Sequence, residues 1–213
     1  MTTIGFLHTA YAHVDTFRAL VRELGPGQDV HVVDESLLAE ARERGVDEAI
    51  RRRLLLRLRE VAAAGADVVV CTCSTLSGYA ERLSDAAGVQ VVRVDRPMAE
   101  AAVAAGRRIA ILATVASTLA PTRELLTSCA SPGTEIIDAL CPHAWPLFEA
   151  GDLDGYAHRI AAYARTLETE VIVLAQASMA PAEPLLADCG KPVLSSPRIA
   201  VQHATQLCSK LYM

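Results

Sequence analysis

Aromatic side chains are scarce in this sequence, which has only three Phe, five Tyr and one Trp among 213 residues. Small and aliphatic residues replace them, and 52% of the chain is hydrophobic. This composition is typical of Val- and Ile-rich strands that are buried on both faces and covered by Ala- and Leu-rich helices. The length allows a sizeable core, or two small lobes that share one cleft.

The sequence also lacks the features of several other protein classes. Its formal net charge is −5, so no overall positive field attracts nucleic acid. No apolar run reaches the roughly 18 residues of a membrane span, and Ile4–Leu7 is too short an apolar core for a signal peptide. The six cysteines form no C-x-x-C pair and lack the partners of a zinc site. We therefore expect a cytoplasmic protein without a metal or a membrane partner.

Nicotinamide binding is also disfavoured, because the turn after the first predicted strand, His8–His13, contains no glycine. A run of arginines, Arg51–Arg53 with Arg57 and Arg59, lies in a helical pattern whose leucines supply a buried stripe. We interpret these arginines as a solvated helix face rather than a binding patch. No cofactor is predicted.

Strand-like and helix-like segments alternate along the chain, which predicts parallel sheets built from β-α-β units. The predicted strands are 3–7, 30–34, 67–71, 90–94, 108–113, 135–138, 170–174 and 192–194. The predicted helices are 14–24, 36–64, 76–87, 97–105, 118–129, 153–168 and 198–211.

An internal repeat divides the chain into two similar halves. Ile4–Thr9 aligns with Ile109–Thr114 at an offset of 114 − 9 = 105, and Asp67–Leu76 aligns with Glu170–Met179 at 176 − 73 = 103. Two segments that repeat at nearly one spacing favour a duplication. We predict two pseudo-symmetric α/β lobes, 1–95 and 96–195, with the helix of 196–213 packing back on the first and the active site in the cleft between the lobes.

Polar residues follow four of the predicted strands. In parallel α/β sheets, ligands bind beyond the carboxyl ends of the strands, so these residues are candidates for binding a small anion through hydroxyls and backbone N–H groups. They are His8, Thr9, Cys73, Ser74, Thr75, Thr114, Ser117, Thr118, Gln176 and Ser178.

The stretch Val68–Thr75, a hydrophobic strand that ends in Cys71-Thr72-Cys73-Ser74-Thr75, resembles the first catalytic-cysteine motif of the aspartate/glutamate/hydantoin racemase superfamily. Ile109–Thr114, followed by Ser117-Thr118, is similar to the strand and threonine-rich turn that open the family's second half. The resemblance covers most of the chain. It implies two α/β lobes, no cofactor, and two cysteines that exchange protons with the substrate's α-carbon from opposite faces.

The sequence departs from that family at one decisive position. Gln176 stands where the second catalytic cysteine is expected. A glutamine side chain has no titratable proton, so it cannot serve as a general acid or base. The two-cysteine mechanism therefore does not transfer intact. Relatives with one active-site cysteine include decarboxylases, although these usually retain the second cysteine rather than the first.

Cys73 is the candidate base or nucleophile, because a thiol at a strand-to-helix turn is activated by the helix N-terminus. Cys71 is interpreted as a core residue. His8 is placed either to orient or deprotonate the thiol, or merely to cap a strand end. His143 could supply the missing second acid, but a surface-loop histidine is the favoured interpretation.

These residues predict a cofactor-independent isomerase, a racemase or epimerase in amino acid metabolism that acts on a small carboxylate. Cys73 and His8 would be catalytic, with Gln176 as a neutral partner. Thr9, Ser74, Thr75, Thr114, Ser117, Thr118 and Ser178 would bind the substrate. A single-cysteine decarboxylase or carbon–carbon lyase remains an alternative, as does a non-catalytic small-acid binding protein. A homo-oligomer is compatible with the sequence.

Overall fold

The computed structural model describes residues 2–25 and 27–211. Their contacts divide the chain into two compact units. The first unit contains the residues up to Val94 and those from Pro197 onward, and the second runs from Asp95 to Ser196. Among the helices in this described part, none is long and apolar enough to cross a membrane.

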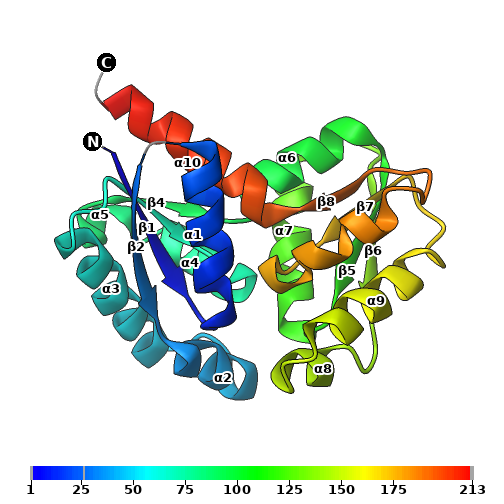
Figure 1. The fold of residues 1–213 in the computed structure, drawn as a ribbon, viewed down its shortest axis with the longest axis horizontal. Helices are drawn as coiled ribbons and strands as arrows, with labels where there is room; N and C mark the ends of the chain where they lie inside the picture. The colour runs from blue at the N-terminus through cyan, green and yellow to red at the C-terminus, as the bar shows by residue number, and fades with distance from the viewer. Residues whose placement is uncertain (1, 26, 212–213) are drawn as a thin grey trace. The chain divides into compact units, whose positions relative to one another are not determined.

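A parallel sheet of four strands, in the order β2-β1-β3-β4, forms the centre of the first unit (Figure 1). β1 pairs with β3 so that Leu7 lies beside Cys71 near the carboxyl end of both strands. The elements of this unit are β1 (Thr3–His8), α1 (Ala12–Leu24), β2 (Gln28–Val33), α2 (Glu35–Arg44), α3 (Glu48–Ala63), β3 (Val68–Cys71), α4 (Ser74–Glu81), α5 (Ser84–Ala87), β4 (Gln90–Arg93) and α10 (Ser196–Leu211).

The second unit has a parallel sheet of the same design, in the order β6-β5-β7-β8. Each strand therefore takes the place of the strand four earlier in the chain. The elements are α6 (Arg96–Ala105), β5 (Arg108–Ala113), η1 (Ala116–Thr118), α7 (Leu119–Cys129), β6 (Glu135–Leu140), α8 (Trp145–Glu149), α9 (Leu153–Ala164), β7 (Val171–Leu174), η2 (Ala177–Ala182), η3 (Pro184–Leu186) and β8 (Val193–Ser195). The predicted architecture, two lobes each built on a parallel sheet, is confirmed.

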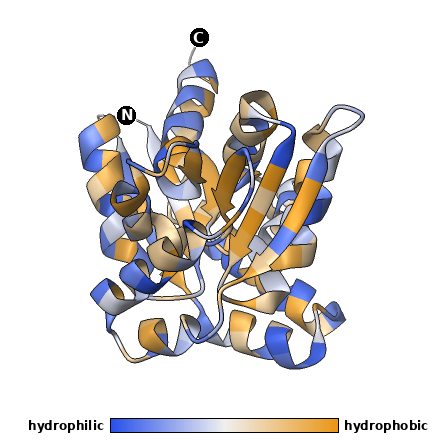
Figure 2. Ribbon diagram, turned by 90° about the vertical axis from the view of Figure 1, so that its right-hand side faces the viewer, coloured by the Kyte–Doolittle hydropathy of each residue, from blue (hydrophilic) through white to orange (hydrophobic). Residues whose placement is uncertain are grey.

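Helices bury both faces of each sheet, because successive side chains of a strand point to opposite faces. In the first unit, Leu7 and Val69 pack with Leu54 and Leu58 of α3. Phe6, the neighbour of Leu7, faces the other way and packs against Phe17 of α1, with ring centroids 5.1 Å apart. Figure 2 shows the consequence, since the strands are largely hydrophobic while the helices carry both colours.

The second unit repeats this arrangement. Leu112 and Leu174 pack with α9, η2 and η3 on one face of the sheet. Ile111 and Val173 pack with α6 and α7 on the other. Burying each such side chain contributes about 1.5–3 kcal/mol, so these two-sided cores hold the carboxyl ends of β5 and β7 in fixed positions.

Two predicted helices are each interrupted in the structure. The predicted helix 36–64 is two helices, because Gly45 takes a left-handed φ of 75° and Asp47 starts α3 by accepting a hydrogen bond from the Ile50 N–H over 2.9 Å. The predicted helix 76–87 is α4 followed by α5. There the Ser84 hydroxyl contacts both the Glu81 carbonyl, at 2.7 Å, and the Val91 N–H, at 3.1 Å. The short helices α8, η2 and η3 were not predicted.

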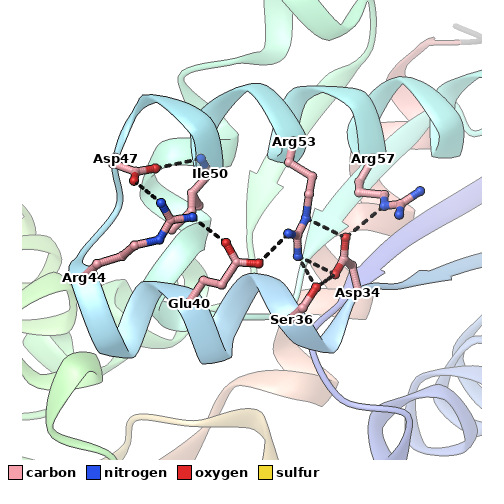
Figure 3. Close-up of polar contacts among 8 residues, drawn as sticks. All are labelled: Asp34, Ser36, Glu40, Arg44, Asp47, Ile50, Arg53 and Arg57. Atoms are coloured by element: carbon pink, nitrogen blue, oxygen red, sulfur yellow. Dashed lines mark hydrogen bonds and ion pairs between the residues drawn. The ribbon is translucent and has the colours of Figure 1, made fainter.

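Two of the arginines interpreted as a solvated face have a structural role (Figure 3). Arg53 donates to both carboxylate oxygens of Asp34, over 3.0 and 2.8 Å, and Arg57 donates over 3.0 Å. Burial alone would raise the pKa of Asp34, but hydrogen bonds from Ser36, Arg53 and Arg57 outweigh it and lower that pKa to about 2. These ion pairs therefore connect Asp34, at the start of α2, with Arg53 and Arg57 of α3.

Candidate active site

Cys73 lies in the turn that joins β3 to α4. A run of buried valines ends the strand, and Cys73 takes an extended conformation, φ −96° and ψ 107°, at the N-cap position. Its carbonyl accepts hydrogen bonds from the N–H groups of Leu76 and Ser77, over 3.0 and 2.8 Å. Cys73 therefore stands at the N-terminus of α4, where the positive end of the helix dipole favours a negative charge.

The Cys73 thiol is buried, with only 6% of the residue exposed. Burial raises its pKa, since the thiolate loses the solvation of water. Hydrogen bonds from the Thr9 side chain, from the backbone N–H groups of Leu76 and Thr75, and from the Thr75 hydroxyl oppose this rise. The predicted residues Thr9 and Thr75 are thus brought to the thiol, and Ser74 is buried in the same turn.

The two ring nitrogens of His8 contact residues other than Cys73. Its Nδ1 lies 2.9 Å from the Thr72 hydroxyl, and its Nε2 lies 2.8 Å from Nδ1 of His31. Burial, followed by the charges of His13 and His31, lowers the pKa of His8 to about 2. Both ring nitrogens of His8 have these other partners. The described contacts include none between His8 and Cys73.

A chain of hydrogen bonds links Asp29, through His31 and His8, to Thr72 in the Cys73 turn. Asp29 lies 2.7 Å from Nε2 of His31 and also accepts from Arg18 over 3.1 Å. A carboxylate only accepts, so Nε2 of neutral His31 carries the hydrogen and its Nδ1 accepts from Nε2 of His8. The chain ends at Thr72, the residue before Cys73. Sequence reasoning missed Asp29 and His31, because nothing in their spacing identifies them.

Gln176 occupies the turn after β7, at the position equivalent to Cys73. Its side-chain oxygen accepts hydrogen bonds from the Thr114 N–H at 2.6 Å, the Thr114 hydroxyl at 3.0 Å and the Val115 N–H at 3.1 Å. These three bonds tie the end of β7 to the end of β5. Gln176 is half-buried, and its amide nitrogen donates to no residue in the described part of the chain.

Tyr156 of α9 joins two of the predicted binding residues. Its hydroxyl lies 3.0 Å from the Thr114 hydroxyl and 2.9 Å from that of Ser178. Burial raises the pKa of Tyr156 to about 12, so the phenol stays protonated at neutral pH. Sequence reasoning missed this residue, since it stands within an ordinary helical pattern and its partners are 42 and 22 positions away.

The remaining predicted residues lie at the edges of these two turns. Ser117 and Thr118 form the short helix η1 just after Thr114, with Thr118 buried and Ser117 half-buried. His143 stands in an exposed turn after β6 with a left-handed φ of 60°. Cys71 is a core residue, 1% exposed. Residues 2–25 and 27–211 contain no group of three His, Cys, Asp or Glu side chains suited to a metal ion.

The two units share one parallel α/β topology. A buried thiol follows a strand of the first unit, and a carboxamide stands at the equivalent place in the second. The protein is therefore a duplicated α/β protein. The family model described as Asp/Glu/Hydantoin racemase matches residues 4–204. The chain belongs to this family.

Solved structures share the fold at low sequence identity. Glutamate racemase from Aquifex pyrophilus has a TM-score of 0.70 and 20% identity, with 97% of this chain and 84% of that chain covered. Aspartate racemase from Picrophilus torridus has a TM-score of 0.72 and 12% identity, covering 98% and 95%. Allantoin racemase from Klebsiella pneumoniae has a TM-score of 0.69 and 18% identity, with 99% of this chain and 89% of that chain covered. No curated protein matches the sequence closely enough to count as a relative.

Proposed function

We propose that this protein is a cofactor-independent isomerase that removes and returns the proton beside the carboxylate of a small amino or dicarboxylic acid, with Cys73 as the base. The observation that carries the proposal is the environment of the thiol. Burial keeps it protonated at rest, while Thr9, Thr75 and the backbone N–H groups of α4 stand ready to stabilise the thiolate. The family, whose solved relatives include racemases of glutamate, aspartate and allantoin, supports the same chemistry.

The substrate's carboxylate and the enediolate formed from it need hydrogen-bond donors. Thr9, Ser74 and Thr75 supply hydroxyls beside Cys73, and Ser117 and Thr118 supply them in the second unit, where the Thr114 hydroxyl instead donates to Gln176. Removing one well-placed donor to a developing anion typically lowers the rate about 100–1000-fold. Gln176 adds two amide hydrogens, but no proton that it can release at neutral pH.

Gln176 restricts the proposed proton exchange to one face of the substrate's α-carbon. A racemase with two thiols removes the α-proton from either enantiomer, because a base faces each side of the carbon. With Gln176 at the second position, only the enantiomer whose α-hydrogen points at Cys73 exchanges readily. The same feature favours a second candidate, a decarboxylase or other carbon–carbon lyase, which needs a single residue to protonate the product.

Proton NMR of each enantiomer of aspartate and glutamate, incubated with the protein in deuterium oxide, tests the proposal. We expect exchange of the α-hydrogen from one enantiomer only, and none with Cys73→Ser. Gln176→Cys is expected to extend exchange to the other enantiomer. Release of carbon dioxide from a malonate-type acid would instead assign the lyase. A non-catalytic small-acid binder would bind these acids without exchange or release, and equal exchange from both enantiomers in the wild type would reveal a second base.

The proposal requires neither a metal nor a cofactor, and it is compatible with a homo-oligomer. All six cysteines are free, which suits the reducing environment of the cytoplasm. Dialysis against a strong chelator is therefore expected to leave α-hydrogen exchange unchanged. Loss of exchange that zinc or manganese restores would contradict the metal-independent mechanism.

A further inference from the structure

The orientation of the Gln176 amide is fixed by its neighbours. The N–H groups of Thr114 and Val115 point at one terminal atom of the side chain, over 2.6 and 3.1 Å. A backbone N–H can only donate, so this atom is the oxygen and the other is the NH₂ group. No ambiguity between the two ends of the amide remains.

The direction of three further hydrogen bonds follows from this assignment. The amide oxygen only accepts, so Thr114 spends its single hydroxyl hydrogen on Gln176, over 3.0 Å. Thr114 must then accept from Tyr156, 3.0 Å away. Tyr156 in turn has no second hydrogen, so it accepts from Ser178 over 2.9 Å. The reverse order would leave two oxygens facing each other at 3.0 Å without a hydrogen between them.

The end of this chain presents a defined chemistry. Ser178 has given its only hydrogen to Tyr156, which stays protonated, so its hydroxyl offers lone pairs alone. Gln176 offers amide hydrogens alone. Both residues are half-buried rather than fully enclosed, so a small ligand can reach them. The turn therefore holds one fixed acceptor and one fixed donor, two positions apart.

We propose that Ser178 selects substrates that carry a hydrogen-bond donor, an amino, hydroxyl or amide N–H group, next to the oxygen that Gln176 binds. This inference rests on the proposed function only in taking the second unit's turn as part of the substrate site. It reverses the role expected of Ser178 from the sequence, since Ser178 accepts from the substrate rather than donating to its carboxylate. It also disfavours 2-oxo acids, whose keto oxygen would meet the lone pairs of Ser178.

Binding, not turnover, tests this selectivity, so that the result does not depend on the proposed reaction. Calorimetry on Cys73→Ser would compare lactate with pyruvate, and 2-hydroxyglutarate with 2-oxoglutarate, because in each pair a hydroxyl that can donate is replaced by a keto oxygen that can only accept. We expect the hydroxy acid of at least one pair to bind about tenfold or more tightly, the cost of facing an acceptor with an acceptor. Equal affinities, tighter binding of the oxo acids, or no binding of any of the four at millimolar concentration would overturn the proposal.

A second variant tests the chain itself. In Cys73→Ser/Tyr156→Phe, Ser178 loses its acceptor and its hydroxyl turns freely, so the preference should fall to about threefold or less. Ser178→Ala in the same background should abolish the preference. Tyr163→Phe, a half-buried tyrosine on the same helix, is the matched control and should leave the preference intact. An unchanged preference in Tyr156→Phe, in a protein with the parent's thermal midpoint, would assign the selectivity to another residue.

Discussion

Thr114 donates two hydrogen bonds to the side chain of Gln176, one from its N–H over 2.6 Å and one from its hydroxyl over 3.0 Å. Thr9, at the equivalent place in the first unit, donates to the thiol of Cys73. In both units, a threonine just after the first strand of the unit therefore donates to the side chain in the turn after the third strand. Only the accepting group differs, a thiol in one unit and a carboxamide in the other.

Replacing Gln176 by Glu separates the two functions of its amide. The glutamate keeps an oxygen for Thr114 and Val115, so the thermal midpoint should change little. It replaces two donor hydrogens with a negative charge, so an acidic ligand should bind at least about tenfold more weakly. Calorimetry with the tightest-binding acid measures this loss. Unchanged affinity would show that the amide hydrogens do not reach the ligand.

Thr9→Val should make Cys73 less reactive. Thr9 stabilises the thiolate, so its removal lets burial raise the thiol pKa further and lowers the thiolate fraction at a given pH. We expect alkylation of Cys73 by iodoacetamide at pH 8, followed by mass spectrometry of its peptide, to slow about threefold to tenfold. Thr3→Val, at the start of the strand that Thr9 follows, is the control. Faster alkylation of the Thr9 variant would show that the hydroxyl shields the thiol instead.

His8, which is buried, and His13, which is half-buried, should make the protein sensitive to mild acid. The folded-state pKa of His8 is lowered to about 2 and that of His13 to about 4, against 6.5 for an exposed histidine. The unfolded chain therefore binds protons first, and stability falls as the pH drops from about 6.5 towards 4. Urea unfolding from pH 7.5 to 4.5 measures this slope. His8→Gln should start less stable but show a shallower slope, whereas the exposed His158→Gln should match the wild type.

The Asp34 network should contribute stability in a different pH window. The pKa of the Asp34 carboxyl is about 2 in the folded state, below the ordinary 3.8. The contribution of the network to the free energy of unfolding is therefore complete above pH 4 and disappears as the pH falls towards 2. Asp34→Asn should cost about 1–3 kcal/mol at pH 7, because Arg53 and Arg57 lose a charged acceptor. The gap between wild type and variant should narrow below pH 4. The exposed Asp85→Asn is the control, and a gap that stays constant with pH would contradict the assignment.

Much of the fold was predictable from local pattern. Buried parallel strands show as Val- and Ile-rich runs, and the duplicated runs around Leu7 and Leu112 predicted two similar sheets. The break after Arg44 was harder to see, because one glycine with a left-handed φ interrupts a pattern that is otherwise helical on both sides. One long helix and two consecutive shorter helices give nearly the same hydrophobic periodicity in the sequence, so the periodicity did not reveal the break.

The candidate site was predictable only in part, for a related reason. Thr9 and Cys73 follow neighbouring strands of the first sheet, Thr114 and Gln176 follow neighbouring strands of the second, and the carboxyl ends of neighbouring parallel strands lie at one edge of a sheet. His31, Asp29 and Tyr156 act through partners that are near only after folding, such as Thr114, which is 42 positions from Tyr156. For the same reason, the sequence left two roles open for His8, since a strand-end position does not say which neighbour the ring contacts, and the structure shows contacts with Thr72 and His31.

The order of the chain and the order of its folding need not agree. The first unit is completed by α10, whose Val201 and Ala204 are fully buried and whose Arg198 binds Glu23 of α1 through two hydrogen bonds of 2.8 and 2.9 Å. On a ribosome, these residues emerge after the whole of the second unit. The second unit, continuous from Asp95 to Ser196, has all its parts earlier. The unit that contains Cys73 therefore begins before the second unit in the chain but is completed only after it.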